Sequence, residues 1–202
     1  FGTTDIADAG DPGRDLPEIE DLRLLFQEAR RLFPGAGLTR GHVLSAFTGV
    51  RPLLRQDGAT LASSREHRVL DEDGLVTIAG GKLTTWRTMG LATVDAVVSR
   101  LGQGGASPDS LLEEPLPGGH DELPELETVL VDEMVRHAED VVFRRLPIGH
   151  DPGEARRALP SIIERMAAQF DWDPERCEEE SARVTLRLAA GAARLDEALG
   201  SA

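Results

Sequence analysis

The chain has 202 residues, of which 40% are hydrophobic, so it is long enough to bury a core and is not typical of a fibrous or disordered protein. Its formal net charge of −14 excludes general binding to nucleic acid, because a polyanion would be repelled over most of the surface. No apolar run reaches the roughly 20 residues needed to cross a bilayer, and the N-terminal residues lack the pattern of a secretion signal. We therefore expect a cytoplasmic protein that touches a membrane, if at all, from outside.

The N-terminal half of the chain alternates between predicted strands and helices. Periodicity and turn signals predict a strand end with a glycine-rich turn over 1–14, a helix over 18–33, a strand over 42–54, a hairpin with strands at 64–70 and 75–79, and a helix over 84–101. The acidic turn 71–74 joins the hairpin strands, and Thr84 or Thr85 can cap the helix that follows. In that helix the apolar face is formed by Gly90, Val94, Val97 and Leu101.

The C-terminal half is predicted to contain helices only. After a connection rich in Gly, Pro and Ser over 102–119, helices are expected over 123–146, 158–170 and 174–199, the first with a break near Asp132 or Glu133. Within the last helix, the acidic run 178–180 is typical of a solvated face. The fold class is therefore an α+β region followed by an all-α domain.

A strand, a glycine hinge and a helix start follow one another between Val76 and Arg87. Glycines let a ligand approach the backbone, and the free amides of a helix start favour negative charge. Gly80, Gly81, Lys82, Leu83 and Thr84 could thus hold a phosphate or the electron-rich edge of a reduced flavin. The alternative is a plain structural turn, because strand-Gly-Gly-helix turns are common.

Three cations lie in special contexts of this acidic chain. Lysine and arginine together number 22, and Lys82 is the single lysine. Arg51 precedes Pro52, which favours an extended backbone, and Arg65 begins a predicted strand. Arg51, Arg65 and Lys82 could together form an anion pocket, although each cation taken alone also fits a surface position. The histidines and the one cysteine, Cys177, show no spacing of a metal site or of a nucleophilic triad.

Taken in order, the motifs resemble the flavin-linked glycerol-3-phosphate dehydrogenases and oxidases, and the resemblance covers nearly the whole chain. The motifs that carry it are Gly2-Thr3-Thr4-Asp5, Gly10-Asp11-Pro12, Gly49-Val50-Arg51-Pro52-Leu53, Ser64-Arg65-Glu66-His67, the run from Gly74 to Thr85, Asp132-Glu133-Met134, the run from Ala138 to Arg145, and Phe170-Asp171-Trp172. Two positions depart from the family pattern: Trp86 replaces a tyrosine, and Leu146-Pro147 replaces a continuation that contains threonine.

The resemblance implies a truncated FAD enzyme of the D-amino-acid-oxidase type. Residues 1–116 would be the C-terminal part of its interleaved FAD and substrate-binding region, which is incomplete here, and residues 117–202 a helical C-terminal domain. The glycine fingerprint that grips the dinucleotide would lie upstream. On this reading the fragment alone is inactive.

The resemblance also implies the reaction, which is oxidation of sn-glycerol 3-phosphate to dihydroxyacetone phosphate with FAD as cofactor and a quinone, or oxygen in the oxidases, as electron acceptor. Arg51, Arg65 and Lys82 would bind the substrate, and Gly80, Gly81, Lys82, Leu83 and Thr84 would meet the flavin. The catalytic base would lie upstream of this chain. Peripheral contact with the inner face of the cell membrane and a homodimer fit the same picture.

Two other functions stay open at the level of the sequence. A related FAD-dependent amine or amino-acid oxidase would share the fold, but it would bind a carboxylate and would not need the three cations. A non-catalytic helical interaction module would use only the acidic C-terminal helices.

Overall fold

The computed structural model describes residues 1–4, 16–50, 66–102 and 124–200. The chain divides into two compact units, one formed by Phe1–Gly49 with Leu116–Ala202 and the other by Val50–Pro115. Its described part is mostly helical, with one small sheet and a helical C-terminal region, which agrees with the predicted order of an α+β region and an all-α region. The predicted functional boundary at residues 116 and 117 stays a prediction.

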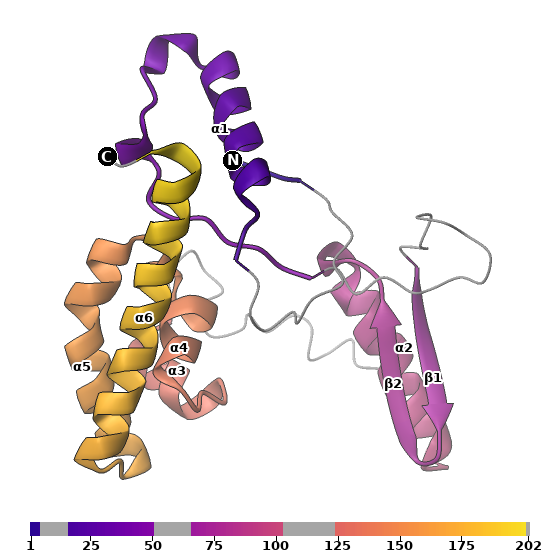
Figure 1. Cartoon of the computed structure of the whole chain (residues 1–202). Helices are drawn as coiled ribbons and strands as arrows, with labels where there is room; N and C mark the ends of the chain where they lie inside the picture. Colours follow the sequence, from indigo (N-terminus) through magenta and orange to yellow (C-terminus); the bar gives the residue numbers. More distant parts are fainter. Residues whose placement is uncertain (5–15, 51–65, 103–123, 201–202) are drawn as a thin grey trace. The chain divides into compact units, whose positions relative to one another are not determined.

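Helices build the first of these units (Figure 1). Its elements are α1 (Ile19–Leu32), short turns at Pro34–Ala36 and Arg40–His42, α3 (Leu126–Asp132), α4 (Ala138–Asp140), a π-helical turn at Val141–Arg145, a short turn at Pro147–His150, α5 (Pro152–Phe170) and α6 (Pro174–Leu199). The helices predicted over 18–33 and 174–199 are confirmed. The predicted break near Asp132 is confirmed too, because α3 ends there and Met134 has a positive φ of 54°. Helix α5 begins earlier than predicted, since Asp151 accepts hydrogen bonds from the amides of its first turn.

Two apolar clusters hold the helical unit together. The main cluster joins α3, α4 and the π-helical turn to α5 and α6 through Val129, Leu130, Val135, Ala138, Val141, Val142, Ala155, Leu159, Ile162, Met166, Val184 and Leu188. The smaller cluster lies where α1 packs on the end of α6 and consists of Leu22, Leu195 and Ala198. Arg23 of α1 adds a hydrogen bond from its Nε to the carbonyl oxygen of Ala198 at 3.0 Å.

The strand predicted over 42–54 is wrong for its described part. Arg40–His42 form a helical turn, and residues 43–50 form no strand. Val43 and Ala46 are partly buried against the smaller apolar cluster. These apolar side chains therefore find burial on helices, where the sequence pattern had suggested a sheet. At the N-terminus, residues 1–4 form no strand, and the rest of the predicted 1–14 segment lies outside the described residues.

The second unit is a hairpin with a helix. Strands β1 (His67–Glu72) and β2 (Leu75–Gly80) pair antiparallel, from His67 opposite Gly80 to Glu72 opposite Leu75. Asp73 and Gly74 form the turn with φ values of 49° and 88°, the geometry of a two-residue hairpin loop that an Asp-Gly pair favours. The predicted hairpin is thus confirmed, with a shorter turn than expected.

Helix α2 (Trp86–Arg100) lies along this hairpin (Figure 1). Its first turn brings Met89 against Gly81, and Arg100 near its end forms an ion pair with Asp71. The predicted apolar face is left largely uncovered by the described residues, with Val94, Val97 and Leu101 at 44%, 38% and 64% exposure. A helix that is apolar on more than one side is typical of a buried element of a larger domain. None of the helices in the described ranges is both long and apolar enough to span a bilayer.

Candidate functional site

The glycine turn after β2 is built from a backbone that only glycine adopts easily. Gly80 and Gly81 both have a φ of 80°, in the left-handed region that side chains disfavour. A Cβ added to Gly81 would collide with Sδ of Met89 and would lie 3.4 Å from Cβ of His67. Both the backbone and the packing therefore require glycine at position 81.

Lys82 is held in place by a threonine three residues later. The amide of Lys82 donates a hydrogen bond to Oγ1 of Thr85 at 3.1 Å, and the same hydroxyl donates to the carbonyl oxygen of Lys82 at 2.9 Å. Thr85 is the residue before α2, as the sequence predicted, but its side chain closes the short turn Leu83–Thr85 and does not cap α2. The backbone of Lys82 is thus fixed directly before a helix start.

Lys82 and the acidic turn lie at opposite ends of the hairpin. Lys82 follows the end at which Gly80 pairs with His67, whereas Glu72 and Asp73 lie at the turn. Six residues of strand separate the two ends, about 20 Å at 3.3 Å per residue. The Lys82 side chain is exposed and makes no ion pair with any residue of the described ranges. Lys82 precedes the turn Leu83–Thr85 and the start of α2 in the sequence, and an ammonium and the amides of a helix start both attract negative charge.

The structure describes five of the predicted site residues and leaves two of them outside its described ranges. Gly80, Gly81, Lys82, Leu83 and Thr84 form one continuous turn, in which the Leu83 side chain is 87% exposed. Arg51 and Arg65 lie outside the described residues, so the anion pocket that combines them with Lys82 stays a prediction.

Two neighbours of the turn were missed by the sequence analysis. Met89 and His67 pack against Gly81. The four-residue spacing of Thr85 and Met89 places them on one face of the helix start and could have indicated the first. His67 is brought to the turn by the register of the hairpin, which the sequence alone does not determine.

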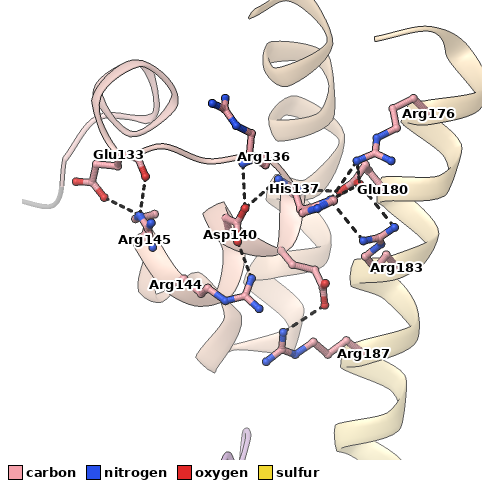
Figure 2. A network of polar contacts seen from close by, with 12 residues as sticks. Glu133, Arg136, His137, Asp140, Arg144, Arg145, Arg176, Glu180, Arg183 and Arg187 are labelled. Carbon is pink, nitrogen blue, oxygen red and sulfur yellow. Dashed lines mark hydrogen bonds and ion pairs between the residues drawn. The ribbon is translucent and has the colours of Figure 1, made fainter. Parts of the chain in front are cut away.

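A second concentration of charge lies in the helical unit, where α6 meets the start of α4 (Figure 2). The carboxylate of Glu180 is fully buried and contacts Nδ1 of His137 at 2.8 Å, the amide of Ala138 at 2.8 Å and a guanidinium nitrogen of Arg176 at 2.7 Å. Burial raises the pKa of Glu180, but the hydrogen bonds from His137 and the Ala138 amide and the charges of His137 and Arg176 outweigh it, so the pKa lies below its ordinary value. The acidic run 178–180 is therefore not the uniformly solvated face that was predicted.

Three further arginines of this network are each paired with a carboxylate, which is typical of a structural network. Arg144 contacts Asp140 at 2.7 Å and Arg145 contacts Glu133 at 3.2 Å, two pairs that Figure 2 labels. Arg187 contacts Glu139 at 3.2 Å. The pairs connect the α3–α4 loop, the π-helical turn and α6. These three arginines thus each have a carboxylate partner, whereas Lys82 has no ion-pair partner within the described ranges.

Asp140 provides a test of this structural role. Its Oδ2 accepts hydrogen bonds from the amides of Arg136 and His137, both at 2.9 Å, and its Oδ1 contacts Arg144. Burial raises the pKa of Asp140, but these two amides and Arg144 outweigh it and hold the pKa below its ordinary value of 3.8.

We expect Asp140→Ala to lower the free energy of unfolding by about 1–2 kcal/mol at pH 7, as for the loss of a helix-capping carboxylate. Because the pKa of Asp140 is lowered in the folded state, its ionised carboxylate stabilises the fold above pH 3.8, and this stabilisation is lost as the pH falls through the lowered pKa. The difference in unfolding free energy between variant and wild type should therefore shrink in acid. Urea unfolding at pH 7 and pH 3 measures this difference. Arg156→Ala, at an exposed arginine of α5, is the control, and an Asp140→Ala loss of equal size at both pH values would argue against the assignment.

A shallow surface groove of about 590 Å³ lies on α6 and does not suit the same chemistry. Its lining residues are Cys177, Glu178, Ser181, Ala182, Thr185 and Leu186. The lining contains one carboxylate and no cation, so it would not attract a phosphate. Within the described ranges, no group of three His, Cys, Asp or Glu residues is arranged to hold a metal ion.

Comparison with known proteins identifies relatives that match between half and about four fifths of the chain. A protein named glycerol-3-phosphate dehydrogenase from Synechocystis is 38% identical over 145 residues, which is 69% of this chain and 26% of that protein. This chain is a homologue of the glycerol-3-phosphate dehydrogenases. The mitochondrial glycerol-3-phosphate dehydrogenase of Bos taurus is 28% identical over 82% of this chain and 31% of its own length. The aerobic glycerol-3-phosphate dehydrogenase of Staphylococcus haemolyticus is 38% identical over 50% of this chain and 19% of its own length.

The chain thus spans about a fifth to a third of the glycerol-3-phosphate dehydrogenases that it matches. No family model matches the chain. The predicted resemblance to this group is confirmed by relatives with both bacterial and mitochondrial names.

Proposed function

We propose that this chain is the C-terminal part of an FAD-dependent glycerol-3-phosphate dehydrogenase, which oxidises sn-glycerol 3-phosphate to dihydroxyacetone phosphate. The observation that carries the proposal is the turn at Gly80–Thr84 in a homologue of proteins with this name. In this turn, the exposed Lys82 directly precedes the helical turn Leu83–Thr85 and makes no ion pair within the described ranges. The chain as a whole has a net charge of −14.

The turn fits one edge of a flavin. Gly80 and Gly81 present a backbone without side chains at φ values of 80°, and the exposed Leu83 and Thr84 follow at the helix start. The ring would be held by the backbone amides of Gly80, Gly81, Lys82, Leu83 and Thr84. The positive end of the helix dipole at this point would stabilise negative charge on the ring. When bound, FAD would supply the acceptor for the hydride that leaves the substrate alcohol.

The substrate phosphate would be bound by the three predicted cations. Arg51 would bind its oxygens bidentately, while Arg65 and Lys82 would contribute further positive charge. These contacts would orient the alcohol carbon, and the catalytic base would come from the rest of the polypeptide. The two-stranded sheet and the uncovered apolar face of α2 support a place within a larger domain of the D-amino-acid-oxidase type.

A quinone is the electron acceptor that we propose for this enzyme. Transfer of electrons to a membrane-dissolved quinone would place the protein in the cytoplasm, in peripheral contact with the inner face of the cell membrane. A homodimer is the assembly that we propose with it.

Absorbance tests the proposal directly. We expect the complete polypeptide that contains this chain to purify yellow, and its visible flavin absorbance to bleach when glycerol 3-phosphate is added anaerobically. Glycerol, which lacks the phosphate, is the control and should bleach the flavin far more slowly. Bleaching by amino acids but not by glycerol 3-phosphate would favour the amino-acid oxidase alternative. This chain alone should purify colourless, because the dinucleotide-binding segment is expected upstream.

A further inference from the structure

Two arginines of α6 converge on a single atom of His137, next to the buried carboxylate of Glu180 (Figure 2). Nη2 of Arg176 lies 3.1 Å from Nδ1 of His137, and Nη1 of Arg183 lies 3.4 Å from the same nitrogen. The two arginines are separated by about two turns of the helix, so both project from the same side of α6. Their guanidinium groups are therefore close enough for one small ligand to contact both.

His137 cannot accept a hydrogen bond from either arginine. Its Nδ1 lies 2.8 Å from Oε1 of Glu180, and the pKa of Glu180 lies below its ordinary value, so this carboxylate is ionised at neutral pH. A ring nitrogen at this distance from a carboxylate carries the hydrogen and donates it, which leaves no lone pair on Nδ1 for Arg176 or Arg183. The arginine nitrogens nearest to the ring thus face another donor.

The carboxylates of the described residues leave both arginines with unused donors. Nη2 of Arg176 is 2.7 Å from Oε1 of Glu180, but its Nη1 is 3.6 Å from Glu179. Nη2 of Arg183 is 4.0 Å from the same Glu180 oxygen, which is beyond hydrogen-bond distance. One buried carboxylate is thus shared by two guanidinium groups, a ring N–H and the amide of Ala138. The donors outnumber the acceptors that these carboxylates offer.

Both guanidinium groups can be reached from solvent, and one of them is restrained by an aromatic ring. The side chains of Arg176, Arg183 and His137 are 33%, 43% and 39% exposed. The guanidinium carbon of Arg176 lies 5.6 Å from the centre of the Trp172 ring, a cation–π contact that restricts its movement. A ligand from solvent would therefore meet donors that are already partly ordered.

We propose that Arg176 and Arg183 form a binding site for a phosphate group, where α6 meets the start of α4. Arginine forks match phosphate oxygens, and a phosphate has enough oxygens to contact both guanidinium groups at once. Its charge of nearly −2 lets it compete with the exposed Glu179 for Arg176 better than a single carboxylate would. The inference does not depend on the proposed function, because all its residues lie in the helical unit. A soluble phosphate compound and a lipid headgroup share this chemistry.

The test follows thermal unfolding of this chain as inorganic phosphate is added, with the ionic strength kept constant by sodium chloride. We expect the midpoint to rise in the wild type, because a ligand that binds only the folded state stabilises it. Arg183→Gln should need roughly tenfold more phosphate for the same rise, since one charged donor is lost. Arg183→Lys should lie between the two. The long contact of Arg183 with Glu180 contributes little to the fold, so both variants should fold.

Arg194→Gln is the matched control, because Arg194 is a cation of the same helix, 30% exposed and 3.6 Å from Glu197. It should need the same phosphate concentration as the wild type. Phosphate also stabilises proteins generally through its exclusion from their surface, and any binding at Lys82 would act alike in all these variants. An equal rise in the wild type, Arg183→Gln and Arg194→Gln would therefore overturn the inference, and so would the absence of a rise.

Vesicles distinguish the two sources of the phosphate group. Co-sedimentation with vesicles of phosphatidylcholine and phosphatidic acid, absent with phosphatidylcholine alone and lost in Arg183→Gln, would assign the site to a lipid headgroup. Stabilisation by phosphate without vesicle binding would assign it to a soluble phosphate compound. We expect the second result, because an anionic membrane surface repels a chain with a net charge of −14.

Discussion

Lys82→Met in the complete polypeptide is expected to lower kcat/KM for glycerol 3-phosphate by roughly 10²-fold, the size of effect seen when one charged donor is removed from a preorganised site. The physical reason is the isolation of this ammonium. It makes no ion pair within the described ranges, and the acidic turn of the hairpin lies at the opposite end. Its charge is therefore available to a ligand.

The matched control for this prediction is Arg87→Met. Arg87 is an exposed cation five residues further on, in the first turn of α2, and its removal changes the net charge by the same amount. We expect kcat/KM to change less than about twofold in this control, because the exposed Arg87 side chain is not among the residues assigned to the substrate or the flavin, and a solvated charge acts only through screened long-range attraction. Lys82→Arg should retain part of the activity. Equal losses in Lys82→Met and Arg87→Met would mean that general charge, and not the turn, attracts the substrate.

Glu180→Ala is expected to destabilise the helical unit by about 3 kcal/mol at pH 7, because the loss of one member of a buried ion pair leaves its partners without compensation. The Ala138 amide would lose its acceptor in the protein interior, and Arg176 and His137 would face each other without the carboxylate between them. Removal of the fully buried side chain would also leave a cavity. Unfolding of this chain in urea, followed by circular dichroism, measures the loss.

The adjacent acid supplies the control for Glu180. Glu179 is 56% exposed and lies 3.6 Å from Arg176, so Glu179→Ala should change stability by no more than about 0.5 kcal/mol. The pKa of Glu180 is lowered in the fold from its ordinary value of 4.5. Its ionic contribution is therefore complete above pH 4.5 and is lost as the pH falls through the lowered value, so the difference between wild type and Glu180→Ala should shrink in acid. A difference that grows below pH 4.5 would contradict the network as described.

The sequence determined the elements whose signals are local. Asp73-Gly74 between two apolar runs predicts the hairpin, and the two glycines at positions 80 and 81 predict the turn before α2. Helical periodicity and stop signals likewise give α1 and α6 their bounds. These features depend on backbone preferences of neighbouring residues, so they could be inferred without knowledge of the fold. The continuous run from Gly80 to Thr84 belongs to this class, and it carries the resemblance to glycerol-3-phosphate dehydrogenases.

Only the tertiary structure determines which of several chemically identical side chains is buried and which stay exposed. Glu178, Glu179 and Glu180 look alike in the sequence, yet the roughly 100° rotation between successive helix residues directs only Glu180 into the interior, where His137 and Arg176 meet it. In the same way, Val43 and Ala46 lie in a segment that reads as a strand by composition, but they pack on the cluster that α1 and α6 form. Burial and long-range partners are set by the packing of distant segments, which no local pattern encodes.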